Sequence, residues 1–168
     1  MQELSYEQAM SYALRLLGFR RRTEKELIER LAGKGYDSEL RDRVLARLKE
    51  WGYIDDRSYV EGYVRSKVKP SGKHLLKREL LRKGVDKEVV ERGLEKNYTR
   101  EQELQAAEEL AVKLWHQAGE RNTGLEQTKE MHQKNWQKTA NRLLARGFSY
   151  DIVKVVLRKV DPDFNNED

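Results

Sequence analysis

The sequence contains no cysteine, which excludes disulfide bonds and thiolate metal sites. It has only two prolines and three phenylalanines, whereas leucine, lysine, arginine and glutamate are abundant, and this composition favours an all-α fold. No stretch approaches the roughly 18 apolar residues of a membrane span. The N-terminal region also lacks the apolar core of a signal peptide. We therefore expect a soluble protein of the cytoplasm.

The sequence also lacks the motifs of an active site. No glycine-rich loop ending in Lys-Ser or Lys-Thr is present, so no phosphate-binding nucleotide site is predicted. His74, His116 and His132 share no metal-ligand spacing, and we expect each of them at the surface. Ser71 has no evident base partner. We expect neither an enzyme nor a cofactor.

Asp55 and Asp56 are the one adjacent pair of carboxylates that invites a metal-site interpretation. They follow Gly52 and precede an amphipathic stretch, with no third ligand nearby. Aspartate at that position is typical of a helix cap. We interpret the pair as the start of a helix, although the metal site stays open as an alternative.

A seven-residue motif occurs three times in the chain. Each copy has a leucine four residues before a glycine, a cation just before it, an apolar residue after it, and then Asp or Ser. The copies are Leu31–Asp37, Leu80–Asp86 and Leu143–Ser149. The pattern fits a Schellman cap, in which the C′ residue is left-handed, a conformation that costs a side chain about 1 kcal/mol. We predict positive φ at Gly35, Gly84 and Gly147, with Asp37, Asp86 and Ser149 capping the helices that follow.

The agreement between the copies continues downstream. The residues five, nine and ten positions after each glycine are Leu40, Val44 and Leu45, then Val89, Gly93 and Leu94, then Ile152, Val156 and Leu157. A joint that recurs with its core positions in register indicates a repeat protein. We predict an all-α fold of three tandem three-helix repeats, similar to helix-turn-helix units, in an elongated, curved array. The expected repeats are 1–54, 55–98 and 99–160, followed by a disordered acidic tail at 161–168.

Three further pairs are spaced as capping boxes and so predict helix starts: Ser5 with Gln8, Thr23 with Glu26, and Thr99 with Gln102. The third repeat is longer than the second, because Gly35 and Gly84 are 49 residues apart and Gly84 and Gly147 are 63 apart. The surplus falls in a polar stretch that contains two glycines. We predict an inserted, mobile polar connection at 116–135.

The net charge of +5 is concentrated in the middle of the chain. Residues 57–98 hold 12 cations and 6 acids, whereas the segments on either side are nearly balanced. Glu79 is the single acid between Arg65 and Lys83. Such an uncompensated run favours an anionic partner or an acidic protein surface. The candidate partner-binding residues are Arg65, Lys67, Lys69, Lys73, Lys77, Arg78 and Arg82, with Arg20, Arg21 and Arg22 as a second patch.

Four segments resemble the RecX family of recombinase regulators. They are Thr23–Leu27 with Leu31 and Lys34-Gly35-Tyr36; Trp51–Asp56 with Tyr59 and Val60; Gly72 with Leu76–Leu80 and Lys83-Gly84-Val85; and Arg142–Phe148. The resemblance covers residues 9–159, and the first two segments are its most specific part. The long 116–135 connection departs from the usual pattern of the family.

The resemblance implies a non-enzymatic regulator that binds RecA and its filament on single-stranded DNA, lying along the filament groove. Such proteins restrain strand exchange, ATP hydrolysis and co-protease activity, and so tune recombinational repair and the SOS response. We expect a monomer. Two other classes stay open: a protein that binds single- or double-stranded DNA directly through basic, helix-turn-helix-like repeats, and a scaffold that binds another protein through apolar faces.

Overall fold

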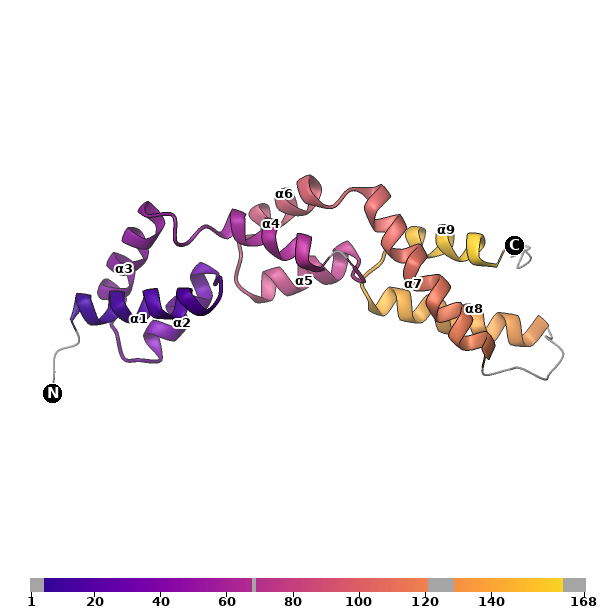
Figure 1. Ribbon diagram of the computed structural model, residues 1–168, viewed down its shortest axis with the longest axis horizontal. Helices are drawn as coiled ribbons and strands as arrows, with labels where there is room; N and C mark the ends of the chain where they lie inside the picture. Colours follow the sequence, from indigo (N-terminus) through magenta and orange to yellow (C-terminus); the bar gives the residue numbers. More distant parts are fainter. Residues whose placement is uncertain (1–4, 68, 121–128, 162–168) are drawn as a thin grey trace. The chain divides into compact units, whose positions relative to one another are not determined.

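The computed structural model describes residues 5–67, 69–120 and 129–161, and within these ranges it contains nine α-helices and no strand (Figure 1). The predicted all-α class is therefore confirmed. The helices are α1 (Tyr6–Phe19), α2 (Glu24–Ala32), α3 (Ser38–Glu50), α4 (Asp56–Lys67), α5 (Lys73–Arg82), α6 (Lys87–Asn97), α7 (Arg100–Glu120), α8 (Lys129–Ala145) and α9 (Tyr150–Val160).

The three predicted glycine joints are confirmed. Gly35, Gly84 and Gly147 have φ values of 88°, 82° and 84°. Each joint carries both hydrogen bonds of a Schellman motif: in the first, Gly35 N donates to Ala32 O at 2.9 Å and Tyr36 N donates to Leu31 O at 3.3 Å. The same two bonds recur at Gly84 and Gly147.

A fourth Schellman joint ends α3 at Gly52, with φ of 72° and a bond from Tyr53 N to Leu48 O at 2.9 Å. The sequence signal for it was weaker, because Trp51 replaces the cation.

Side-chain caps begin most of the predicted helices. Asp37 accepts a hydrogen bond from Leu40 N at 2.8 Å, and Asp86 accepts one from Glu88 N at 2.8 Å. The boxes at Ser5 with Gln8 and at Thr99 with Gln102 are complete. The prediction for Ser149 was wrong in its chemistry: it holds the N-cap position, but its hydroxyl donates to the side chain of Asp151 instead of capping the backbone.

The contacts divide the chain into two compact units. The first comprises Met1–Tyr63 and Glu79–Gly93, and the second comprises Val64–Arg78 and Leu94–Asp168. The middle repeat thus contributes residues to both units. The proposed boundaries at 54/55 and 98/99 stay a prediction.

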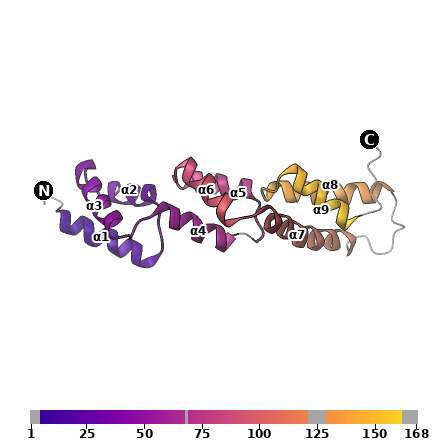
Figure 2. The same cartoon turned by 90° about the horizontal axis from the view of Figure 1, so that it is seen from above.

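Each unit has its own apolar core. In the first, α1, α2 and α3 pack together around a buried set that includes Ala9, Ala13, Leu27, Leu31, Val44 and Leu48. In the second, α7 packs against both α8 and α9 around Ala107, Ala111, Leu143, Phe148, Ile152 and Val156 (Figure 2). Val44, Ile152 and Val156 are among the core positions that the repeat register predicted.

The predicted polar connection at 116–135 requires a correction. α7 continues through Glu120 and α8 already begins at Lys129, so both ends of the segment are helical. The segments are rich in Gln, Ala, Glu, Lys and Met, which are good helix formers, and Leu114 and Trp136 pack against the core of the second unit. Residues 121–128 lie outside the described residues, as do residues 162–168 of the predicted tail.

Candidate functional site

The arginine run that was proposed as a second patch makes several contacts within the first unit. Arg20 forms an ion pair with Glu26 at 3.0 Å, and Arg21 donates to the carbonyl of Ser58 at 3.2 Å. Arg22 donates to the carbonyl of Leu16 at 3.3 Å, and burial, followed by the charge of Arg20, lowers its pKa. These contacts tie the connection between α1 and α2 to both helices and to α4. Much of the patch therefore has a structural role.

The lysines of the basic run are also partly engaged. Lys69 forms an ion pair with Glu109 at 2.6 Å, and the ammonium of Lys73 lies 5.9 Å from the centre of the Tyr98 ring. Lys73 and Lys77, proposed as partner-binding residues, are half-buried. Leu76 and Leu80 on the same helix are completely buried.

Lys69 is exposed but paired, and four further cations of the run are exposed to solvent: Arg65 and Lys67 at the end of α4, and Arg78 and Arg82 on α5. Arg78 and Arg82 are one helical turn apart, so they share one face of α5. Glu79, the single acid of the run, accepts a 2.6 Å hydrogen bond from the hydroxyl of Tyr63. Burial and this contact raise the pKa of Tyr63. These four cations are the candidate contact residues, and the name basic surface refers below to this set of side chains.

Asp55 and Asp56 act as caps. Asp55 accepts from Arg57 N at 2.9 Å and from the hydroxyl of Ser58 at 2.8 Å, which fixes the start of α4. Asp56 accepts from Glu24 N at 3.0 Å, so it caps the start of α2 from a different helix. Burial raises the pKa of Asp56 despite that hydrogen bond. Across residues 5–67, 69–120 and 129–161, no cluster of three His, Asp or Glu side chains could hold a metal ion.

His132 departs from the expectation of a surface residue. Its Nδ1 lies 3.3 Å from the carboxylate of Asp161, and its ring lies 6.3 Å from that of Trp115. Asp161 itself is buried. No sequence pattern indicates this contact, because it depends on how α7, α8 and the end of α9 pack. His74 and His116 are exposed as expected.

Comparisons with known proteins identify relatives of the chain. The model of the first three-helix domain of RecX matches residues 9–48, and that of the second matches residues 55–94. A regulatory protein RecX from Leuconostoc citreum is 30% identical over 162 residues, covering 95% of this chain and 57% of the relative. A regulatory protein RecX from a Mycobacterium species is 48% identical over 90 residues, covering 52% of this chain and 49% of the relative. The chain thus spans less than two thirds of the length of these relatives.

The fold has a counterpart among solved structures. The crystal structure of RecX from Lactobacillus salivarius matches with a TM-score of 0.81 and 26% identity, covering 94% of this chain and 97% of that one. In the described part of the chain, each helix is too short or too polar to cross a bilayer.

Proposed function

Because the chain belongs to the RecX family, we propose that it regulates the RecA recombinase by binding RecA and its filament on single-stranded DNA. In this proposal it mainly inhibits strand exchange, ATP hydrolysis and co-protease activity, and it has no catalytic activity of its own. It acts in the cytoplasm as a monomer. The choice of RecA as the partner rests on the family resemblance.

The observation that supports the proposal is the basic surface. Arg65, Lys67, Arg78 and Arg82 are exposed, and the single acid in their stretch is held by Tyr63. A run of exposed cations that outnumbers its acids attracts an acidic protein face or a phosphate backbone, and it raises association rates.

The test is a charge reversal on α5. The double variant Arg78→Glu/Arg82→Glu should raise the concentration needed for half-inhibition of RecA-driven ATP hydrolysis by about tenfold, since two contact charges are reversed. Its melting temperature should change little, because both side chains are exposed.

The matched control is Lys134→Glu/Lys138→Glu, which reverses two exposed cations one turn apart on α8. It changes the net charge equally and should leave inhibition intact. If the wild type and the α5 variant are both folded and inhibit equally, the basic surface does not contact RecA.

Direct DNA binding is the second candidate, because the same four cations could contact phosphates. Fluorescence anisotropy at moderate salt compares naked single-stranded DNA with the RecA filament. Weak binding to the naked strand and tight binding to the filament would support the first proposal. The opposite order, with a salt slope that falls by about one for each arginine removed, would support the second.

A further inference from the structure

The Gly84 joint holds the beginning of a helix from earlier in the chain. The hydroxyl of Thr23, the N-cap of α2, donates to the carbonyl of Lys83 at 2.7 Å. Glu26, three residues later, forms an ion pair with the ammonium of Lys83 at 3.1 Å. The side chain of Lys25 lies so close to Gly84 that a Cβ there would be 2.0 Å from its Cδ. All of these residues belong to the first unit.

The Gly147 joint holds the beginning of α5 in the same manner. Gly72 N donates to the carbonyl of Arg146 at 2.9 Å, and His74 N donates to the carbonyl of Gly147 at 3.1 Å. A Cβ at Gly147 would be 2.3 Å from the backbone nitrogen of Leu75. These residues belong to the second unit. In both joints, the carbonyl of the cation just before the glycine accepts a hydrogen bond from the start of an incoming helix.

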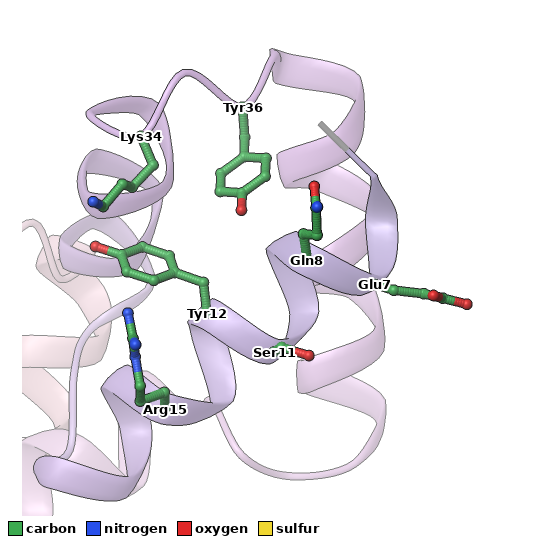
Figure 3. Close-up of a pocket in the computed structure, with 7 residues that line it drawn as sticks. All are labelled: Glu7, Gln8, Ser11, Tyr12, Arg15, Lys34 and Tyr36. Carbon is green, nitrogen blue, oxygen red and sulfur yellow. The ribbon is translucent and has the colours of Figure 1, made fainter. Parts of the chain in front are cut away.

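The Gly35 joint has the same Schellman backbone but is exposed. Gly147 is buried and Gly84 is half-buried, whereas both Lys34 and Gly35 are exposed. An open hollow of about 700 Å³ lies beside the joint. Figure 3 shows the residues that line it, which are Glu7, Gln8, Ser11, Tyr12, Arg15, Lys34 and Tyr36.

Lys34 of the Gly35 joint lies against a tyrosine ring, as Lys83 of the Gly84 joint does. Lys83 Nζ lies 5.9 Å from the centre of the Tyr59 ring while it pairs with Glu26. Lys34 Nζ lies 5.6 Å from the centre of the Tyr12 ring. Arg15 also lies against the Tyr12 ring, at 5.4 Å from its centre, so two cations converge on this ring (Figure 3).

We propose that Tyr12, Arg15, Lys34, Gly35 and Tyr36, here called the Gly35 surface, dock the first turn of a helix from a partner protein. The fitting helix has Ser or Thr at its N-cap and Glu three residues later, as α2 has. Its hydroxyl donates to the carbonyl of Lys34, and its glutamate pairs with Lys34 and Arg15. This surface is separate from the basic surface, and the inference does not depend on RecA being the partner.

A second copy of the chain is a poor occupant. Thr23 and Gly72 each stand 12 residues before the glycine of their own repeat, and both are already engaged. The corresponding residue of the third repeat, Asn135, lies inside α8, which begins at Lys129. A residue within a helix has its N–H bonded to the preceding turn and cannot act as a cap. The third repeat therefore presents no free helix start at the equivalent place.

The test uses a helical peptide that copies the start of α2. The probe is residues 22–33 with Gly33→Lys, joined by a lactam to Glu29, so that helicity does not depend on docking. It is titrated into the isotopically labelled full chain and followed by NMR chemical shifts. We expect the shift changes to concentrate at Tyr12, Lys34, Gly35 and Tyr36.

Two variants sharpen the result. A peptide with Thr23→Ala and Glu26→Ala should bind about tenfold more weakly, because it loses the hydroxyl and the ion pair. The variant Lys34→Glu of the full chain should weaken binding of the peptide that keeps Thr23 and Glu26 by a similar factor. The melting temperature of this variant should equal that of the wild type.

Several outcomes would overturn the proposal. The first is an absence of shifts at the Gly35 surface with the helical peptide at millimolar concentration. The second is equal affinity for the two peptides, and the third is a response centred on Gly84. Tighter binding of a single-stranded oligonucleotide at the same residues would assign the surface to nucleic acid. Self-association that Lys34→Glu abolishes would assign it to a second copy.

Discussion

Gly93 of α6 lies directly against Val60 of α4. A Cβ at Gly93 would be 2.4 Å from Cγ1 of Val60, which is itself completely buried. The two helices can approach this closely only because Gly93 has no side chain.

The variant Gly93→Ala should therefore lower the free energy of unfolding by about 1–3 kcal/mol, because the stiff, β-branched Val60 cannot move aside. Gly62→Ala in α4 is the matched control, since its Cβ would meet only Arg21 Nη1 at 3.5 Å. That control should be neutral or stabilising by up to about 1 kcal/mol, because alanine favours a helix interior over glycine. Urea denaturation measures both, and equal effects would contradict the close approach.

The glycine joints should differ in their tolerance of alanine. Gly147→Ala should destabilise most, because the new Cβ would meet the backbone of Leu75. Gly84→Ala should cost less, since the flexible side chain of Lys25 can move away. Gly52→Ala is the reference, with nothing within 4 Å, and should cost only the strain of a positive φ, about 1 kcal/mol. Thermal melting of the three variants gives the order, and a reversed order would show that neighbouring contacts do not matter.

The hydroxyl of Thr23 makes two hydrogen bonds, and substitutions can test these bonds separately from the shape of the side chain. It caps α2 by accepting from Glu26 N at 3.2 Å, and it donates to the carbonyl of Lys83 at 2.7 Å. Thr23→Val keeps the volume and loses both bonds in a fully buried position, so we expect a loss of about 2 kcal/mol. Thr23→Ser keeps the hydroxyl and should stay within about 0.5–1 kcal/mol of the wild type. If chemical denaturation gave similar losses for both, the methyl group rather than the hydroxyl would be the important part of Thr23.

The joints could be predicted from the sequence because they are local. A Schellman cap depends on a glycine, a leucine four residues earlier and an apolar residue after it, all within one turn. The partners of the cations could not be predicted in this way. The ion pair of Lys69 with Glu109 spans 40 residues, and the bond of Arg21 to Ser58 spans 37. Such contacts depend on how repeats pack, and the spacing of charges along one helix does not contain that information.

Gly93 shows where a signal existed but was not interpreted. The other two copies of the motif have Val44 and Val156 at this register position, and both are completely buried. A glycine in place of a core valine is typical of a close helix approach. The two ends of the 116–135 segment were misinterpreted as loop for a related reason, because two glycines in a polar stretch were given more weight than the helix formers around them.

The ion pairs of Glu26 predict a pH dependence of stability. Glu26 contacts Arg20 at 3.0 Å and Lys83 at 3.1 Å, and its side chain is only 18% exposed. Burial alone would raise its pKa, but the hydrogen bonds from Arg20 and Lys83 outweigh burial and lower it below the ordinary value of 4.5. A carboxylate with a lowered folded pKa stabilises the fold above its unfolded pKa and loses that contribution as the pH falls.

Glu26→Gln should therefore lower the free energy of unfolding by about 1 kcal/mol at pH 7, where the wild-type carboxylate is charged. The difference in free energy of unfolding between wild type and variant should shrink below pH 4.5. It should disappear once Glu26 is protonated in both the folded and the unfolded state. Glu88→Gln is the control, since its ion pair with Arg92 is long, at 3.4 Å, and both side chains are more than 70% exposed. Urea midpoints measured from pH 3 to pH 7 test this, and a gap between wild type and Glu26→Gln that stays constant over the range would show that the charge of Glu26 does not stabilise the joint.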